Sequence, residues 1–153
     1  MGWEHHKDLF AWDGSLIDIY VLDTTLEDWQ RLLDFLRASP YDLRYSGHSD
    51  AAPLPDRAET IFAQNWEAHV ALSIDESQLS LKCHFFTPDE IEFDLNPHAI
   101  DGQPRLDRLL DFMRALGSTL GKAVILTPEN FQQRPLYRFD PRTDIQEWPT
   151  YGD

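Results

Sequence analysis

The segment HFFTPDEIEFDL, residues 84–95, places acidic side chains at every second position. Glu90, Glu92 and Asp94 alternate there with apolar residues. A period of two is typical of a strand with one buried face and one exposed face. We therefore expect a row of carboxylates on the exposed face, where they could serve catalysis, hold a metal ion or meet a basic partner.

One hypothesis is that this row of carboxylates belongs to a catalytic or metal site. His84, Glu92, Asp94 and His98 together offer the imidazole and carboxylate groups that bind Mn, Fe or Zn. Their spacing matches no metal-binding motif, and neighbouring acids on one open strand do not face each other across a cleft as in a paired-carboxylate hydrolase. A carboxylate row on an uncovered sheet suits a basic protein surface better. We expect no cofactor and no resident metal, and an enzyme using these four residues stays the alternative.

The single cysteine is predicted to be structural. Cys83 shares its strand parity with Leu81 and Phe85, which favours a core position over that of a nucleophile. One cysteine allows no intrachain disulfide. Together with the absence of an apolar leader and of any run long enough to span a membrane, this predicts a cytoplasmic protein with no membrane partner.

Net charge limits the class of partner. The 153 residues include 27 acidic and 13 Lys or Arg side chains, a formal charge of −14. Residues 1–100 hold 19 acids and 6 bases (−13), whereas residues 101–153 hold 8 acids and 7 bases (−1). Such a field repels nucleic acid and steers basic proteins. The sequence also has no phosphate-binding glycine loop, HExxH, CxxC or GxSxG. We expect a protein partner and no nucleic acid.

An aromatic residue beside an acid is predicted at the edge of the same face. Trp66 and Glu67 precede the first of the alternating strands and have the composition of an interface anchor, although Trp66 could instead cover the core. The predicted partner-binding residues are Trp66, Glu67, His84, Glu90, Glu92 and Asp94.

Two amphipathic helices and a β-meander should position these side chains. A buried strand from Ser15 leads into a helix that Pro40 ends, with Thr24 and Glu27 as a capping box and Thr25 as a rival cap. Residues 68–95 contain three alternating strands joined by tight turns. A second helical stripe over residues 105–122 precedes short strands.

The economical packing of these elements is a single α+β domain spanning residues 1–153. We expect a two-layer sandwich, a mostly antiparallel sheet with two helices packed on one face. A surface loop is expected at residues 48–59, and an irregular tail at the C-terminus. The other face of the sheet stays open and carries the acidic row. Oligomeric state does not follow from the sequence.

Three segments resemble bacterial immunity proteins, the small acidic proteins encoded beside polymorphic or contact-delivered toxins. They are IYVLDTTLEDWQRLLDFL, CHFFTPDEIEFDL and the closing stretch from VILTPEN to PLYRFDP. The resemblance lies in size, acidity and α+β order, and it implies a protein that binds a cognate toxin domain and blocks its active site. We therefore expect a non-enzymatic, acidic toxin inhibitor. A nuclease is the expected toxin, because basic surfaces are common where the target is nucleic acid.

Overall fold

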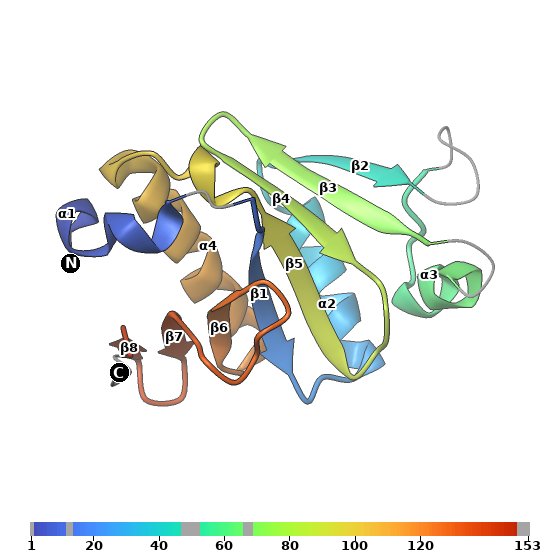
Figure 1. Cartoon of the computed structure of the whole chain (residues 1–153). Coiled ribbons are helices and arrows are strands. Elements are labelled where there is room, and N and C mark those ends of the chain that lie inside the picture. The colour runs from blue at the N-terminus through green and yellow to red at the C-terminus, as the bar shows by residue number, and fades with distance from the viewer. Residues whose placement is uncertain (1, 12–13, 47–52, 66–68, 150–153) are drawn as a thin grey trace.

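One antiparallel sheet organises the chain. The computed structural model describes residues 2–11, 14–46, 53–65 and 69–149. Eight strands in these ranges follow the order β2-β3-β4-β5-β1-β6-β7-β8, so β1 lies in the interior between β5 and β6 (Figure 1). The strands are β1 (Ile17–Leu22), β2 (Asp42–Ser46), β3 (Ala71–Glu76), β4 (Leu79–His84), β5 (Glu90–Leu95), β6 (Val124–Pro128), β7 (Tyr137–Asp140) and β8 (Ile145–Glu147).

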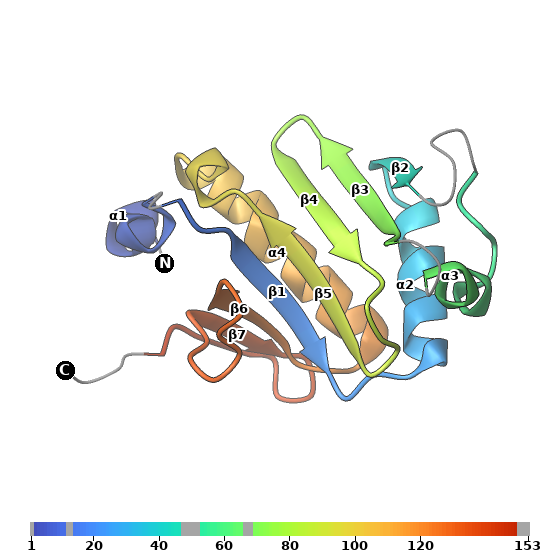
Figure 2. The ribbon, with the colours of Figure 1, turned by 45° about the vertical axis from the view of Figure 1, so that its right-hand side comes forward.

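Helices α2 and α4 cover one face of this sheet (Figures 1 and 2). Trp29 of α2 lies 4.9 Å from Phe85, and Phe112 of α4 lies 5.4 Å from Phe93, measured between ring centroids. All four rings are buried, so the core lies between the two helices and this face. The helical segments are α1 (Trp3–His6), η1 (Lys7–Phe10), α2 (Leu26–Arg37), α3 (Ala58–Asn65), η2 (Pro97–Ala99) and α4 (Gln103–Leu120), of which η1 and η2 are 3-10 helices.

The predicted α+β class and two-layer arrangement are confirmed. Cys83 is buried in the core, as its strand parity predicted. The short helical segments α1, η1 and η2 were not predicted, and neither were α3 and β8. Helix α3 begins at Ala58, inside the expected loop of residues 48–59, and β8 forms where the chain was expected to turn into an irregular tail. Residues 48–52 of that loop, and residues 150–153 of the tail, lie outside the described residues.

Helix α2 begins at the second of the two candidate caps. The Oγ1 atom of Thr25 accepts a hydrogen bond from the backbone N–H of Asp28 at 3.2 Å, and the Asp28 carboxylate accepts one from the Thr25 N–H at 3.0 Å. The hydroxyl of Thr24 instead donates to the carbonyl of Pro88 at 2.7 Å. The predicted box between Thr24 and Glu27 is therefore wrong by one residue, because tertiary contacts decide which hydroxyl faces the helix.

Gly117 allows α4 to approach β7 closely. A Cβ atom added at Gly117 would lie 3.0 Å from Cδ2 of Phe139 and 3.2 Å from the carbonyl oxygen of Lys122. The backbone at Lys122 has little freedom to move, since its N–H donates to the carbonyl of Gly117 itself at 3.3 Å. Glycine at this position thus sets the distance between the helix layer and the β7 side of the sheet.

We expect Gly117→Ala to lower the free energy of unfolding by about 1–3 kcal/mol, the usual cost of overpacking. The effect runs against helix propensity, which favours alanine over glycine by roughly 0.5–1 kcal/mol. Chemical denaturation measures the change. The control is Ser118→Ala, at the neighbouring exposed helix position, which should stay within about 0.5 kcal/mol of the wild type. A Gly117→Ala protein as stable as the wild type would contradict the close approach of α4 and β7.

Candidate binding face

The face of the sheet opposite the helices gathers acidic side chains from β1 and β5. Directly paired residues of antiparallel strands place their side chains on the same face. Asp94 of β5 pairs with Lys82 of β4 on one side and with Asp18 of β1 on the other. In the next row, Glu92 lies between its partners, His84 and Tyr20. We call this surface of β4, β5 and β1 the outer face.

Part of the outer face is covered by the loop that joins β6 to β7, which passes in front of β1 in Figure 1. The backbone N–H of Asn130 donates to Oδ2 of Asp18 at 2.8 Å, and Nε2 of Gln132 donates to Oε2 of Glu90 at 2.9 Å. Asp18 and Tyr20 are each only 2% exposed as a result. The Tyr20 hydroxyl also donates to Asp18 at 3.2 Å, so the covered end of the face is polar but hydrogen-bonded.

Burial and nearby negative charges raise the pKa values of three side chains on this face. Burial raises the pKa of Asp18, and the charges of Asp94 and Glu129 add to the rise, while hydrogen bonds from Asn130 and Tyr20 oppose it. Burial likewise raises the pKa of Glu92, with further contributions from Asp18 and Glu90. The pKa of the Tyr20 hydroxyl is raised by burial and by Asp18. These carboxylates repel one another, and a cationic group placed against them would relieve the repulsion.

Imidazoles and an exposed aromatic ring lie at the β4 side of the outer face. His84 contacts Oδ2 of Asp94 through Nε2 at 2.5 Å and faces Nε2 of His69 through Nδ1 at 3.1 Å. The Phe86 ring is parallel to the His84 ring, with a 1° angle between planes and 5.1 Å between centroids. Phe86 is 52% exposed, so one apolar ring remains accessible beside the acidic rows.

Four of the predicted binding residues are brought together: His84, Glu90, Glu92 and Asp94 lie on adjacent strands of the outer face. Trp66 and Glu67 lie outside the described residues. His98 follows β5 and lies in η2. Within the described ranges, no three His, Cys, Asp or Glu side chains form a group that could hold a metal ion.

Sequence reasoning missed Asp18, Tyr20 and Phe86. Asp18 and Tyr20 alternate with the apolar residues Ile17, Ile19 and Val21 of β1, and this period of two was a usable signal that they point away from the core. Their approach to β5 was not visible, because β1 and β5 are separated by more than 65 residues in the chain. Phe86 continues the outward alternation of His84 beyond the end of β4, so the sequence did indicate its side of the sheet, but not its stacking on the His84 ring.

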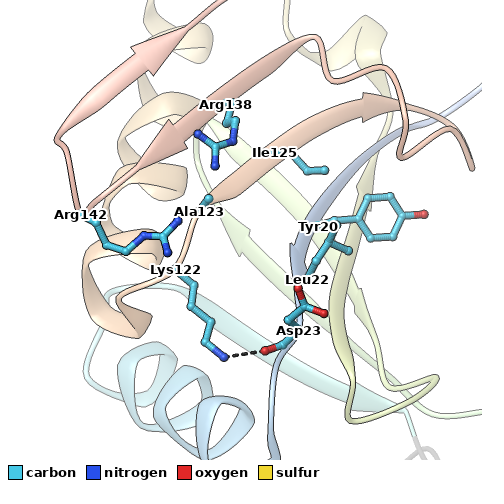
Figure 3. Close-up of a pocket in the computed structure, with 8 residues that line it drawn as sticks. All are labelled: Tyr20, Leu22, Asp23, Lys122, Ala123, Ile125, Arg138 and Arg142. Carbon is cyan, nitrogen blue, oxygen red and sulfur yellow. Dashed lines mark hydrogen bonds between the residues drawn. The ribbon is translucent and has the colours of Figure 1, made fainter.

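A pocket of about 360 Å³ lies beyond Tyr20 on the same side of the sheet and is lined in part by basic residues (Figure 3). Lys122 Nζ donates to Asp28 Oδ2 at 2.7 Å and to the carbonyl of Asp23 at 2.6 Å. Arg142 binds Asp140 through two nitrogens at 3.1 Å, and Arg138 lies 3.6 Å from the same carboxylate. These cations are paired with carboxylates of their own and do not neutralise the acids of β1 and β5.

Comparisons with protein-family models, with curated protein sequences and with solved structures gave no match for this chain. None of the helices in the described residues is both long and apolar enough to cross a membrane. Inferences about function therefore depend on the geometry of the outer face.

Asp18→Asn tests the cost of placing a buried negative charge beside other carboxylates. Since the folded-state pKa of Asp18 is raised, the ionised form destabilises the fold as pH rises through that pKa. The asparagine amide oxygen can accept both hydrogen bonds without the charge. We expect the variant to be more stable than the wild type at pH 7 by up to about 1 kcal/mol, the scale of like-charge pairs across strands.

The difference should vanish below about pH 4, the ordinary pKa of an aspartate, where both proteins are neutral at this position. Denaturation curves at several pH values measure it. Asp89→Asn, which removes one charge at an exposed position, serves as the control and should show no comparable gain. An Asp18→Asn protein no more stable than the wild type at neutral pH would contradict the cost of this buried charge.

Proposed function

We propose that this protein is a non-enzymatic binding protein that docks its outer face on a basic surface of a partner protein. The observation that carries the proposal is the row of partly exposed carboxylates on β5, Glu90, Glu92 and Asp94, which lies beside the buried Asp18 on a face that neither α2 nor α4 covers. Like charges on neighbouring strands cost stability, and a basic partner would offset that cost. Because this face is negatively charged, the partner that complements it is a protein with a positively charged surface.

The partner in this proposal is a toxin domain that the protein neutralises in the cytoplasm. Support comes from the net charge of −14 and from the resemblance of its segments to immunity proteins. The acids steer a basic toxin towards the outer face and speed association. A nuclease fits best, since a protein that binds nucleic acid presents the basic surface this face would accept.

Phe86 is the proposed anchor of the complex. Its half-exposed ring lies at the edge of the acidic rows and is held in place by stacking on His84. Aromatic residues at the centre of an interface contribute much of the binding energy once water is excluded from them. The carboxylates then determine the association rate and orientation, while Phe86 slows dissociation.

An enzyme with a polar site at His84, Glu92, Asp94 and His98 is the alternative function. The contact of His84 with Asp94 favours it, because a carboxylate that orients an imidazole is also a component of acid–base sites. His98, in η2 beyond the end of β5, is not part of this contact. The alternative would be supported by turnover of a substrate that His84→Asn abolishes while the protein still folds.

Removing charge from the outer face should slow capture of the partner. We expect Glu90→Gln combined with Glu92→Gln to lower the association rate by about tenfold at low salt and to flatten its salt dependence. A matched control, Glu27→Gln with Glu59→Gln, removes the same charge from exposed positions of α2 and α3 and should have a smaller effect. Both proteins are compared by surface plasmon resonance against the basic protein recovered from source cells.

The recovered protein is then expressed alone and together with each variant. Growth arrest that the wild type relieves, and that the double variant relieves poorly, supports neutralisation through the outer face. Equal rescue and equal association rates for the two double variants would contradict it. If the recovered partner is not toxic, the outer face remains the proposed docking surface, and the proposal that the partner is a toxin is contradicted.

Phe86→Ala should act on the other rate constant. We expect the dissociation rate of the same complex to rise by tenfold or more, roughly the effect of losing one interface hot spot, with little change in association. Phe131→Ala is the matched control, because Phe131 is also an exposed phenylalanine, 45% accessible, in the loop between β6 and β7. Similar dissociation rates for both variants would remove Phe86 from the centre of the interface.

A further inference from the structure

His69 and His84 present ring nitrogens to each other at the β4 side of the outer face. His69 Nε2 lies 3.1 Å from His84 Nδ1, and the ring centroids are 5.2 Å apart. In a tetrahedral zinc site with Zn–N bonds of about 2.0–2.1 Å, two imidazole nitrogens lie roughly 3.3–3.4 Å apart. The separation of the two nitrogens is therefore within a few tenths of an ångström of that of two ligands on one ion. Binding also requires both rings to turn, so that their lone pairs converge on the ion.

Asp94 fixes the orientation that such a site requires. It lies 2.5 Å from the other ring nitrogen of His84, Nε2, and accepts the proton there. This tautomer leaves a lone pair on Nδ1, the atom that faces His69. A carboxylate behind a histidine, which sets its tautomer and ring orientation, is the usual companion of a metal-binding imidazole.

The surroundings of the two rings also suit a metal ligand pair. The His84 side chain is only 10% exposed, and Phe86 stacks on it and lies 5.1 Å from the ring of His69 as well. An apolar neighbour of this kind limits access of water to the ligands. In the metal-free protein, the Nε2–H of His69 donates a hydrogen bond to His84 Nδ1. Metal binding would require the His69 proton to move to its Nδ1 atom through water, which leaves a lone pair on each of the two facing nitrogens.

We propose that His69 and His84 bind one divalent ion that prefers imidazole, such as Zn²⁺, Ni²⁺ or Cu²⁺, with Asp94 as the positioning residue. The described part of the chain offers no group of three ligand side chains, so two imidazoles hold the ion and its remaining positions are open to water or to a ligand from a docked protein. This inference rests on the two imidazoles and holds whether or not the partner is a toxin.

Titration calorimetry of the metal-free full-length protein with ZnCl₂ tests the site. We expect one equivalent to bind to the wild type and this equivalent to be lost in His69→Asn, whose exposed position leaves folding intact. Asp94→Asn should weaken binding by about 10- to 100-fold, the usual effect of removing a carboxylate behind a ligand. Thermal melts confirm that each variant is folded.

His5→Asn is the matched control, because in the described part of the chain His5 and His6 form a second pair of neighbouring imidazoles. We expect His5→Asn to bind one equivalent of Zn²⁺, as the wild type does. Paramagnetic broadening by Ni²⁺ locates the ion independently, with NMR signals of residues 69–72 and 82–86 expected to broaden first. The proposal is overturned if no heat is detected, if His69→Asn still binds the ion, or if His5→Asn alone abolishes binding. Unchanged affinity in Asp94→Asn would overturn the positioning role.

Discussion

Pairing of β1 with β5 in one register is the constraint on which the outer face depends. Ile19 and Phe93 are partners in this register and must both face the helices, which leaves Asp18 opposite Asp94 on the other side. Burying one large apolar side chain contributes about 1.5–3 kcal/mol, whereas a like-charge pair across strands costs roughly 0.2–1 kcal/mol. A slip of one residue would expose the whole apolar set, so the core holds the carboxylates together despite their repulsion.

The limits of prediction from sequence follow from which contacts are local. Alternation within β4 placed Cys83 in the core, and alternation within β5 placed Glu92 and Asp94 outside it. Within each strand, the side chains that face the core determine which ones face away from it. The neighbourhood of Asp18 and Asp94 arises from strands far apart in the chain, and no local pattern encodes their pairing. Helix α3 was missed for a related reason, since its buried residues, Ala58 and Ile61, form only a short apolar stripe after a proline-containing segment.

Asp28 connects the helix layer to the far side of the sheet. Its carboxylate closes the capping box of α2 with Thr25 and also accepts a hydrogen bond from Lys122, immediately before β6. With only 4% of its side chain exposed, Asp28 needs both partners, because a buried carboxylate without them would be costly. The Asp28 side chain thus connects the start of α2 to the segment that leads into β6. It also pairs with Lys122, which is therefore not available to neutralise the acidic rows.

One face of the sheet forms the core and the other carries the proposed binding residues, and this separation affects how the sequence can diverge. Substitutions on the helix side change packing and are costly, whereas exposed positions on the outer face tolerate change within about 0.5 kcal/mol. The exposed outer positions, such as Ser80 and Lys82 of β4, can therefore change in charge and shape while the architecture persists. Descendants of one ancestral gene could acquire new partners by drift at a handful of strand positions, without passing through an unfolded intermediate sequence.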